Sequence, residues 1–371
     1  MYIKSLKLNN FRNYHALNID FSKNFNVLYG DNAQGKTNII ESIFLCASGR
    51  SHRTSKDIEL IKFDEHGCYI KLDLVKKDAN TEIEIYLGKE EKKKIKVNDV
   101  PIRKIGNLIG HINVVIFSPE DLLVIKEGPS ERRRFIDITL SQLRPSYFYD
   151  LQQYAKVISQ RNTLLKEVQN NKSLFDTLEV WNSNLVCIGS RLIKSRSDFI
   201  KVLSMIAKEN HYKLTDRKEK LDLRYTPSID IKDIDNTKDI EKLFLKILDA
   251  SQRKEILRGT TLYGPHRDDF EIYIDDVNIK AFGSQGQQRT AVLSIKLSEI
   301  KILKEENGEY PVLLLDDVMS ELDRSRQEYL FENLKNIQTF ITCTDINLIK
   351  EKISGESSFY RVSNGEIIEK I

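Results

Sequence analysis

One segment near the N-terminus has the residue types and the spacing that bind a chain of phosphates. Its glycines allow backbone N–H groups to turn inward around phosphate oxygens, its lysine supplies a positive charge, and its last hydroxyl can ligate Mg²⁺. A chance match in a turn is the alternative. Because a strand is expected before the segment and an amphipathic helix after it, we predict a site for ATP and Mg²⁺. The segment fits G-x-x-x-x-G-K-[ST] and consists of Gly30, Asp31, Asn32, Ala33, Gln34, Gly35, Lys36 and Thr37.

Two elements must hold this segment in place. The apolar run from Phe25 to Tyr29 predicts a strand that ends at the first glycine. After the loop, apolar side chains at positions 39, 40, 43, 44 and 47 fall on one helical face, which predicts a helix. Farther along, residues 68–97 alternate between apolar and polar side chains, so we expect antiparallel hairpins there.

An acidic pair follows a second apolar run. Residues 312–315 predict a strand that is buried on both faces. At its end, Asp316 would hold Mg²⁺ through water together with Thr37, and Asp317 would orient the attacking water. Asp317 and Lys36 are therefore the predicted catalytic residues. A core strand with an acidic cap is the alternative, but the phosphate loop favours the functional interpretation.

The phosphate loop and the acidic pair lie near opposite ends of the 371-residue chain, although both must meet the same phosphates. Between them, strand alternation fades and apolar residues recur at helical spacing. We therefore predict an α/β protein: an ATPase lobe with mixed sheets that is split in sequence, and a mainly helical second lobe. The predicted boundaries are 1–118 and 257–371 for the two halves of the ATPase lobe and 119–256 for the helical lobe.

A small polar cluster, Ser284 to Arg289, precedes an amphipathic helix. The free N–H groups and the dipole make such a helix N-terminus an anion site. The cluster resembles the S-G-G-Q signature of the ABC-type ATPases, with Gln285 in place of the first glycine. That resemblance implies that Ser284, Gly286 and Gln287 bind the γ-phosphate of ATP held by a second subunit. A simple capping turn is the alternative.

Two further places can be compared with the same superfamily. Ser320 to Asp323 resembles the D-loop, which lies beside both nucleotides of a dimer, although an acidic helix N-cap would look similar. The superfamily's switch histidine is replaced by Thr344 and Asp345, and its catalytic glutamate by Asp317. We therefore expect ATP hydrolysis to be slow.

Four other stretches resemble the RecF family of bacterial recombination mediators, which is related to the SMC family. The resemblance covers nearly the whole chain and implies a two-lobed head without a long coiled-coil arm. It also implies ATP-dependent head-to-head dimerisation, binding of single-stranded or gapped DNA, and weak DNA-stimulated ATP hydrolysis. With RecR and RecO as partners, such a protein helps to load recombinase in repair, replication and the SOS response. The stretches are 10–14 (NFRNY), 117–122 (FSPEDL), 129–137 (PSERRRFID) and 264–269 (GPHRDD).

The composition neither shows nor excludes contact with nucleic acid. The chain has 58 Lys and Arg against 55 Asp and Glu, a formal net charge of +3, and patches rather than totals create the field that DNA responds to. Two basic clusters could meet DNA phosphates, with solvated charged faces as an equal alternative. They are Arg50 and Arg53 after the first helix, and Arg132, Arg133 and Arg134 at the start of the helical lobe.

We expect a cytoplasmic protein. No apolar run is long enough to span a membrane, and the first residues lack the apolar core of a secretory signal. The four cysteines lie far apart, which argues against a zinc site or a disulfide framework and suits a reducing compartment.

Three other functions share the nucleotide motifs. A transporter ATPase subunit usually has a glutamate where this chain has Asp317, and the four RecF-like stretches also argue against it. A small-molecule kinase places its phosphate loop and acidic strand much closer together. A DNA-binding ATP sensor without meaningful turnover has the same motifs as a slow ATPase, so the sequence leaves that choice open.

Overall fold

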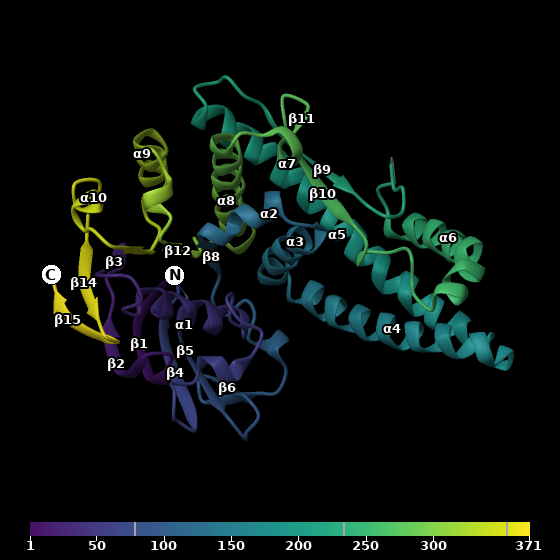
Figure 1. Cartoon of the computed structure of the whole chain (residues 1–371), viewed down its shortest axis with the longest axis horizontal. Helices are drawn as coiled ribbons and strands as arrows, with labels where there is room; N and C mark the ends of the chain where they lie inside the picture. The colour runs from purple at the N-terminus through teal and green to yellow at the C-terminus, as the bar shows by residue number, and fades with distance from the viewer. Residues whose placement is uncertain (78, 233, 354) are drawn as a thin grey trace. The chain divides into compact units, whose positions relative to one another are not determined.

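The computed structural model describes residues 1–77, 79–232, 234–353 and 355–371 (Figure 1). The chain forms two compact units: unit 1 combines Met1–Asp121 with Lys296–Ile371, and unit 2 is the continuous segment Leu122–Ile295. The structure places the second boundary at residue 295 rather than at the expected 256. The reason is that β10 (Asp269–Ile274) pairs with β9 (Leu221–Thr226) inside unit 2.

Unit 1 contains a six-stranded antiparallel sheet in the order β2-β1-β4-β5-β6-β7. Every second side chain of β4 is buried, as the alternation between residues 68 and 97 predicted. One face of the sheet therefore belongs to the core. Its strands are β1 (Tyr2–Phe11), β2 (Tyr14–Asp20), β4 (Gly67–Val75), β5 (Asn80–Gly88), β6 (Lys94–Val97) and β7 (Val100–Ile102).

The second sheet of unit 1 has the order β15-β14-β3-β13-β12-β8, and every pairing except that of β14 with β15 is parallel. The predicted strand β12 is buried at each position, as a strand covered on both faces should be. Because parallel strands end at one edge, the loop after β3 and the acidic pair at the end of β12 share that edge. The strands are β3 (Phe25–Tyr29), β8 (Val114–Phe117), β12 (Val312–Asp316), β13 (Thr339–Cys343), β14 (Ser357–Ser363) and β15 (Glu366–Lys370).

Helix α1 (Lys36–Ser48) contacts strands of both sheets of unit 1. Leu45 and Cys46 are buried as well as the predicted apolar face, because the helix is covered all round. Gly35 precedes the helix with φ 117°, and a Cβ there would lie 2.8 Å from the side chain of Asn13, so only glycine fits. Other helices of the unit are α9 (Arg324–Asn333), α10 (Asn347–Lys350) and the part of α8 (Gln285–Asn307) from Lys296 on, with 3-10 turns at Asp57–Leu60, Ile105–Asn107, Pro119–Leu122 and Met319–Glu321.

Unit 2 is mainly helical, as predicted, and also contains the antiparallel sheet β11-β10-β9. The strand β9 lies inside the region that was expected to be helical. Its elements besides β9 and β10 are α2 (Leu123–Lys126), α3 (Pro129–Leu143), α4 (Pro145–Asn170), a 3-10 turn (Lys172–Leu174), α5 (Thr177–Leu214), α6 (Thr237–Arg258), β11 (Val277–Asn278), α7 (Ile279–Phe282) and the start of α8 (Gln285–Asn307).

A fully buried ion pair joins the long helices of unit 2. The guanidinium of Arg161 on α4 lies 2.6 Å from Glu255 on α6 and donates a 2.8 Å hydrogen bond to Asn182 on α5. Its third nitrogen donates to Thr261 at 2.8 Å. A buried charge with each of its three nitrogens engaged links the helices, and removal of one partner costs about 3–5 kcal/mol. In the described part of the chain, no helix is both long and apolar enough to cross a membrane.

Candidate nucleotide site and signature turn

The two residues predicted to hold Mg²⁺ are in direct contact. Thr37, in the first turn of α1, donates a hydrogen bond to Oδ1 of Asp316 at 2.9 Å. Thr342, at the end of β13, donates to the same oxygen at 2.8 Å and accepts the N–H of Asp317 at 2.9 Å. Asp316 is only 7% exposed, and this burial raises its pKa above the ordinary value, with the two hydroxyls opposing the shift. A divalent cation would favour the ionised form.

Lys36 crosses the phosphate loop that contains it. Its ammonium donates to the backbone oxygens of Gly30 at 2.6 Å and Asp31 at 2.7 Å. Burial lowers the pKa of Lys36, while the nearby carboxylate of Asp317 acts in the opposite direction. The positive charge is thus poorly hydrated and is held by two neutral acceptors. An anionic phosphate oxygen is a stronger hydrogen-bond acceptor and can replace them.

The predicted catalytic carboxylate has an unusual backbone conformation. Asp317 has a φ of 55°, which places it in the left-handed region that Asp and Asn tolerate better than most residues. Its side chain is exposed and lines the same cavity as Lys36 and Thr37. The sharp turn after β12 therefore directs Asp317 into the cavity while Asp316 points back toward Thr37.

The cavity has a volume of about 840 Å³, within the range of small-molecule sites. One part of its wall is the phosphate loop with Lys36 and Thr37. Another part is formed by Arg12, Asn13 and residues 61–63, of which Phe63 is 88% exposed. An aromatic ring beside a phosphate loop offers a surface for the base of a nucleotide. Residues 61–63 carry no motif of their own, so this wall could not be predicted from the sequence.

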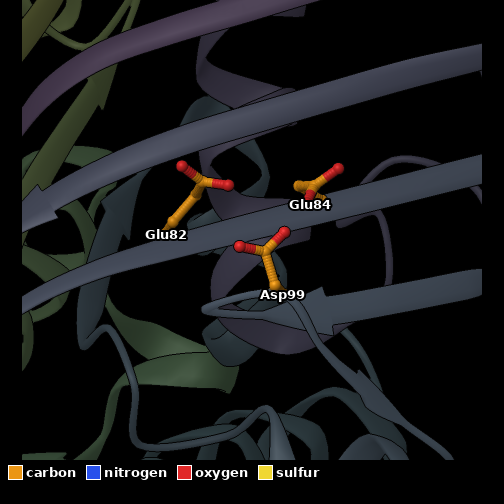
Figure 2. A group of neighbouring side chains, drawn as sticks. All are labelled: Glu82, Glu84 and Asp99. Atoms are coloured by element: carbon orange, nitrogen blue, oxygen red, sulfur yellow. The ribbon is translucent and has the colours of Figure 1, made fainter.

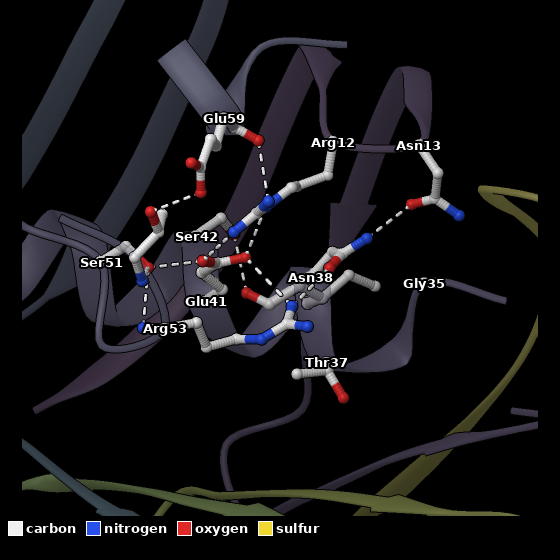
Figure 3. A network of polar contacts seen from close by, with 12 residues as sticks. Arg12, Asn13, Gly35, Thr37, Asn38, Glu41, Ser42, Ser51, Arg53 and Glu59 are labelled. Atoms are coloured by element: carbon white, nitrogen blue, oxygen red, sulfur yellow. Dashed lines mark hydrogen bonds and ion pairs between the residues drawn. The ribbon is translucent and has the colours of Figure 1, made fainter. Parts of the chain in front are cut away.

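A buried glutamate also escaped the sequence analysis. Glu41 on α1 is completely buried, and Figure 3 shows the side chains of Arg12 and Arg53 directed at it. Arg12 donates to its two oxygens at 2.9 and 2.7 Å, Ser51 donates at 2.5 Å, and Arg53 lies 3.4 Å away. Burial on its own would raise the pKa of Glu41, but the hydrogen bonds from Arg12 and Ser51 outweigh it and hold the pKa below its ordinary value.

The predicted signature residues begin helix α8 as a capping box. The N–H of Gln287 donates to Oγ of Ser284 at 3.2 Å, and the N–H of Ser284 donates to Oε1 of Gln287 at 3.0 Å. The capping turn that was the alternative is therefore present, and the N–H of Gln287 is engaged within it. Ser284 and Gln285 are exposed, and the first N–H groups of a helix have no partner inside the helix. The turn, Ser284–Gln287, can still bind an anion through Ser284 and Gly286.

The D-loop-like segment also ends in a helix cap. The side chain of Asp323 accepts the N–H of Arg326 at 2.9 Å and so begins α9. Ser320, earlier in the same segment, is exposed and donates to the backbone oxygen of Asp317 at 3.0 Å. A hydrogen bond thus links the D-loop-like segment to the predicted catalytic residue Asp317.

The structure separates the five predicted DNA contacts into two groups. Arg132 is buried, with a bidentate contact to Asp269 at 2.6 and 2.8 Å, and Arg133 donates to the backbone oxygen of Asp268 at 2.8 Å. The prediction that this whole cluster faces DNA is corrected accordingly, because Arg132 is used inside unit 2. Candidates with exposed side chains are Arg50, Arg53 and Arg134.

An acidic cluster on the antiparallel sheet of unit 1 has structural partners. Figure 2 shows Glu82, Glu84 and Asp99 with their carboxylates close together. Lys71 lies 2.6 Å from Glu82, and Tyr69 donates to Glu84 at 2.8 Å. These cross-strand contacts account for both strand carboxylates, so we assign the cluster no metal.

The fold and the two sites define the class of the protein. A parallel sheet with a phosphate loop after β3, an acidic pair after β12 and a signature-like turn at α8 forms an ATPase head of the ABC and SMC type. This confirms the predicted fold class. A family model described as RecF/RecN/SMC N terminal domain matches residues 2–367.

Curated relatives are more specific. The DNA replication and repair protein RecF of Acetivibrio thermocellus is 56% identical over 365 residues, which cover 98% of this chain and 99% of the relative. The protein of the same name from Clostridium tetani is 49% identical over 369 residues, which cover 100% of both chains. The chain belongs to the RecF family.

Solved structures agree with that assignment. The recombination mediator protein RecF with ATP, described as part of the RecFOR pathway, is 39% identical with a TM-score of 0.93, covering 100% of this chain and 97% of that one. An SMC head bound to the winged-helix domain of ScpA is 16% identical with a TM-score of 0.56, covering 98% and 95%, and shows the same fold.

Proposed function

We propose that this protein is an ATP-dependent, DNA-binding recombination mediator that dimerises head to head around bound ATP. The observation that carries the proposal is the contact of Thr37 with Asp316 at the cavity that Lys36 lines. Family membership supports it, since a relative of 39% identity has been solved with ATP.

The residues of the site fit the two expected ligands. The loop Gly30–Thr37 would hold the triphosphate with its N–H groups and Lys36, and residues 61–63 would contact the base. Thr37 and Asp316 offer hydroxyl and carboxylate oxygens, the hard ligands that Mg²⁺ prefers. The ion, when bound, would neutralise charge on the β- and γ-phosphates. Asp317 would orient the water that attacks the γ-phosphate.

The signature turn explains why ATP would control assembly. The turn Ser284–Gln287 exposes a hydroxyl and a helix N-terminus, which are donors suited to a phosphate. If these donors meet the γ-phosphate held by a second copy, the contact forms only with the triphosphate present. Nucleotide state then shifts the equilibrium between monomer and dimer, and hydrolysis releases the pair.

The biological setting is inferred from the family. We infer that the dimer binds single-stranded or gapped DNA in the cytoplasm and helps to load recombinase during repair, replication restart and the SOS response. RecR and RecO are the inferred partners, in line with the RecFOR pathway named for the solved relatives. ATP hydrolysis, stimulated by DNA, would be weak because Asp317 stands in place of the usual glutamate, and Thr344 and Asp345 stand in place of the usual histidine.

A complementation experiment tests the shared site. We expect Lys36→Ala and Ser284→Arg each to stay monomeric with ATP in sedimentation velocity runs. Their equimolar mixture should dimerise, because one intact site forms from the loop of the Ser284→Arg copy and the signature turn of the Lys36→Ala copy. Ser183→Arg, an exposed serine on α5, is the matched control and should dimerise like the wild type. Normal dimerisation of Ser284→Arg would disprove the shared site.

A further inference from the structure

A charged side chain that belongs to no sequence motif contacts the signature turn through Gln287. Glu219 lies between α5 and β9, and its side chain is 26% exposed. One carboxylate oxygen accepts a hydrogen bond from the side-chain amide of Gln287 at 2.9 Å. The other lies 3.2 Å from Nε2 of His211. A single carboxylate therefore joins the C-terminal end of α5 to the first turn of α8.

The contact of Glu219 fixes which way the Gln287 amide faces. An ionised carboxylate only accepts hydrogen bonds, so it must face the NH₂ group of Gln287. The oxygen of that amide is then directed at the N–H of Ser284, which donates to it at 3.0 Å. Without Glu219 the amide could turn, and the capping box that shapes the signature turn would lose one of its two bonds.

The residues around Glu219 hold its backbone in place. His211 is completely buried, with Nδ1 3.1 Å from Oγ of Ser294 on α8. The N–H of Glu219 donates to Thr215 at 3.3 Å. The next residue, Lys220, donates its N–H to the side chain of Asp275 at 3.1 Å and accepts the N–H of Asp275 at 3.0 Å. The carboxylate is thus presented from a segment that is tied on both sides.

We propose that Glu219 is a positioning residue of the signature turn. It acts through Gln287 to hold Ser284 and the start of α8 in the orientation that receives a phosphate from a second copy of this chain. The proposal rests on the function proposed above, because it needs the turn to face that phosphate. A carboxylate so close to an anion site weakens anion binding by charge repulsion. The hydrogen bond from Gln287 compensates for this repulsion, because it fixes the capping box.

The substitution Glu219→Ala tests the role directly. ATP affinity of the monomer should stay unchanged, because the phosphate loop belongs to unit 1. ATP-dependent dimerisation should weaken about tenfold for each signature turn, hence about a hundredfold for the symmetric dimer. Glu219→Gln should retain most of the dimerisation, since its amide oxygen can accept from Gln287. Glu209→Ala removes an exposed glutamate of α5 and should behave as the wild type.

A mixture separates this inference from the proposed function. Glu219→Ala combined with Lys36→Ala should dimerise better than Lys36→Ala alone, because one site regains both an intact loop and an intact turn. If Glu219→Ala dimerises normally while Ser284→Arg does not, the inference fails and the proposed function stands. If both dimerise normally, the proposed function itself fails. A third outcome would also overturn the inference. If Glu219→Ala lowers both the melting temperature and the ATP affinity of the monomer, the residue has only a structural role.

Discussion

The hydroxyl of Thr37 donates to the carboxylate of Asp316 at 2.9 Å, although 279 positions of sequence separate the two residues. This contact ties the first turn of α1 to the end of β12. Burial raises the pKa of Asp316 in spite of two hydroxyl donors, so ionisation of that carboxyl stays costly until a cation compensates it.

Substitution of Asp316 by Asn should separate stability from activity. Because the folded pKa of Asp316 is raised, the folded protein binds its proton more tightly than the unfolded chain, and the ionised group is destabilising above that pKa. Asp316→Asn should therefore raise the melting temperature of the nucleotide-free protein at pH 7. Mg²⁺-dependent ATP turnover should fall about 10–100-fold, as for an outer ligand of a metal. Asp20→Asn, on the exposed side of β2, is the control, and unchanged turnover in Asp316→Asn would contradict the role.

Asp317 can be tested with two substitutions that differ in backbone preference. Its φ of 55° suits Asn but not Ala, so Asp317→Asn should keep the stability of the wild type and Asp317→Ala should lose about 1 kcal/mol. Both should lower ATP turnover at saturating ATP, since both remove the carboxylate. Urea unfolding measures the first effect and single-turnover kinetics the second. If Asp317→Asn hydrolyses ATP at the wild-type rate, the protein needs no carboxylate there and Asp317 is not catalytic.

The stability contributed by Glu41 should depend on pH. Its folded pKa is depressed, so its contribution is present above the unfolded pKa of about 4.3 and is lost as pH falls through the folded value. Glu41→Gln should cost about 3 kcal/mol at pH 7, because Arg12 loses a buried charged partner. The difference from the wild type should shrink below about pH 4. A difference that stays constant from pH 7 to pH 3 in urea unfolding would show that the charge of Glu41 is unimportant; Glu366→Gln, an exposed residue of β15, is the control.

The basic residues should divide into structural and DNA-facing groups. Arg132→Ala should destabilise unit 2 by about 3 kcal/mol, since it leaves Asp269 without its bidentate partner. Arg50→Ala and Arg134→Ala should leave stability unchanged. Each should reduce the slope of log affinity for single-stranded DNA against log salt by about 0.7 if it contacts a phosphate. Arg324→Ala removes an exposed arginine of α9 as a control. An unchanged slope for both variants would remove Arg50 and Arg134 from the DNA surface.

Much of the nucleotide site could be predicted because each of its two motifs is contiguous in sequence. The loop Gly30–Thr37 and the acidic strand each carry their own flanking elements, and the structure confirms the strands and the helix expected around them. The parallel pairing that joins the two motifs was implied by their shared task rather than by any local pattern.

The remainder depends on contacts that a linear pattern does not contain. Glu41 looks like an ordinary helical glutamate until Arg12, Ser51 and Arg53 fold onto it. Arg132 looks like part of a charged surface, because its partner Asp269 lies 137 positions farther along. Glu219 could not be predicted for the same reason, because its proposed role depends on its contact with Gln287, 68 positions away.

The position of β3 between β13 and β14 also has a consequence for the order in which the protein can form during translation. Unit 2 is continuous and can fold as soon as it leaves the ribosome. The parallel sheet of unit 1 cannot, because the strand at Phe25–Tyr29 needs neighbours that begin at Thr339 and Ser357. At bacterial synthesis rates the N-terminal half waits on the order of tens of seconds with its apolar strand unpaired. Its phosphate loop therefore takes shape last, although it is made first.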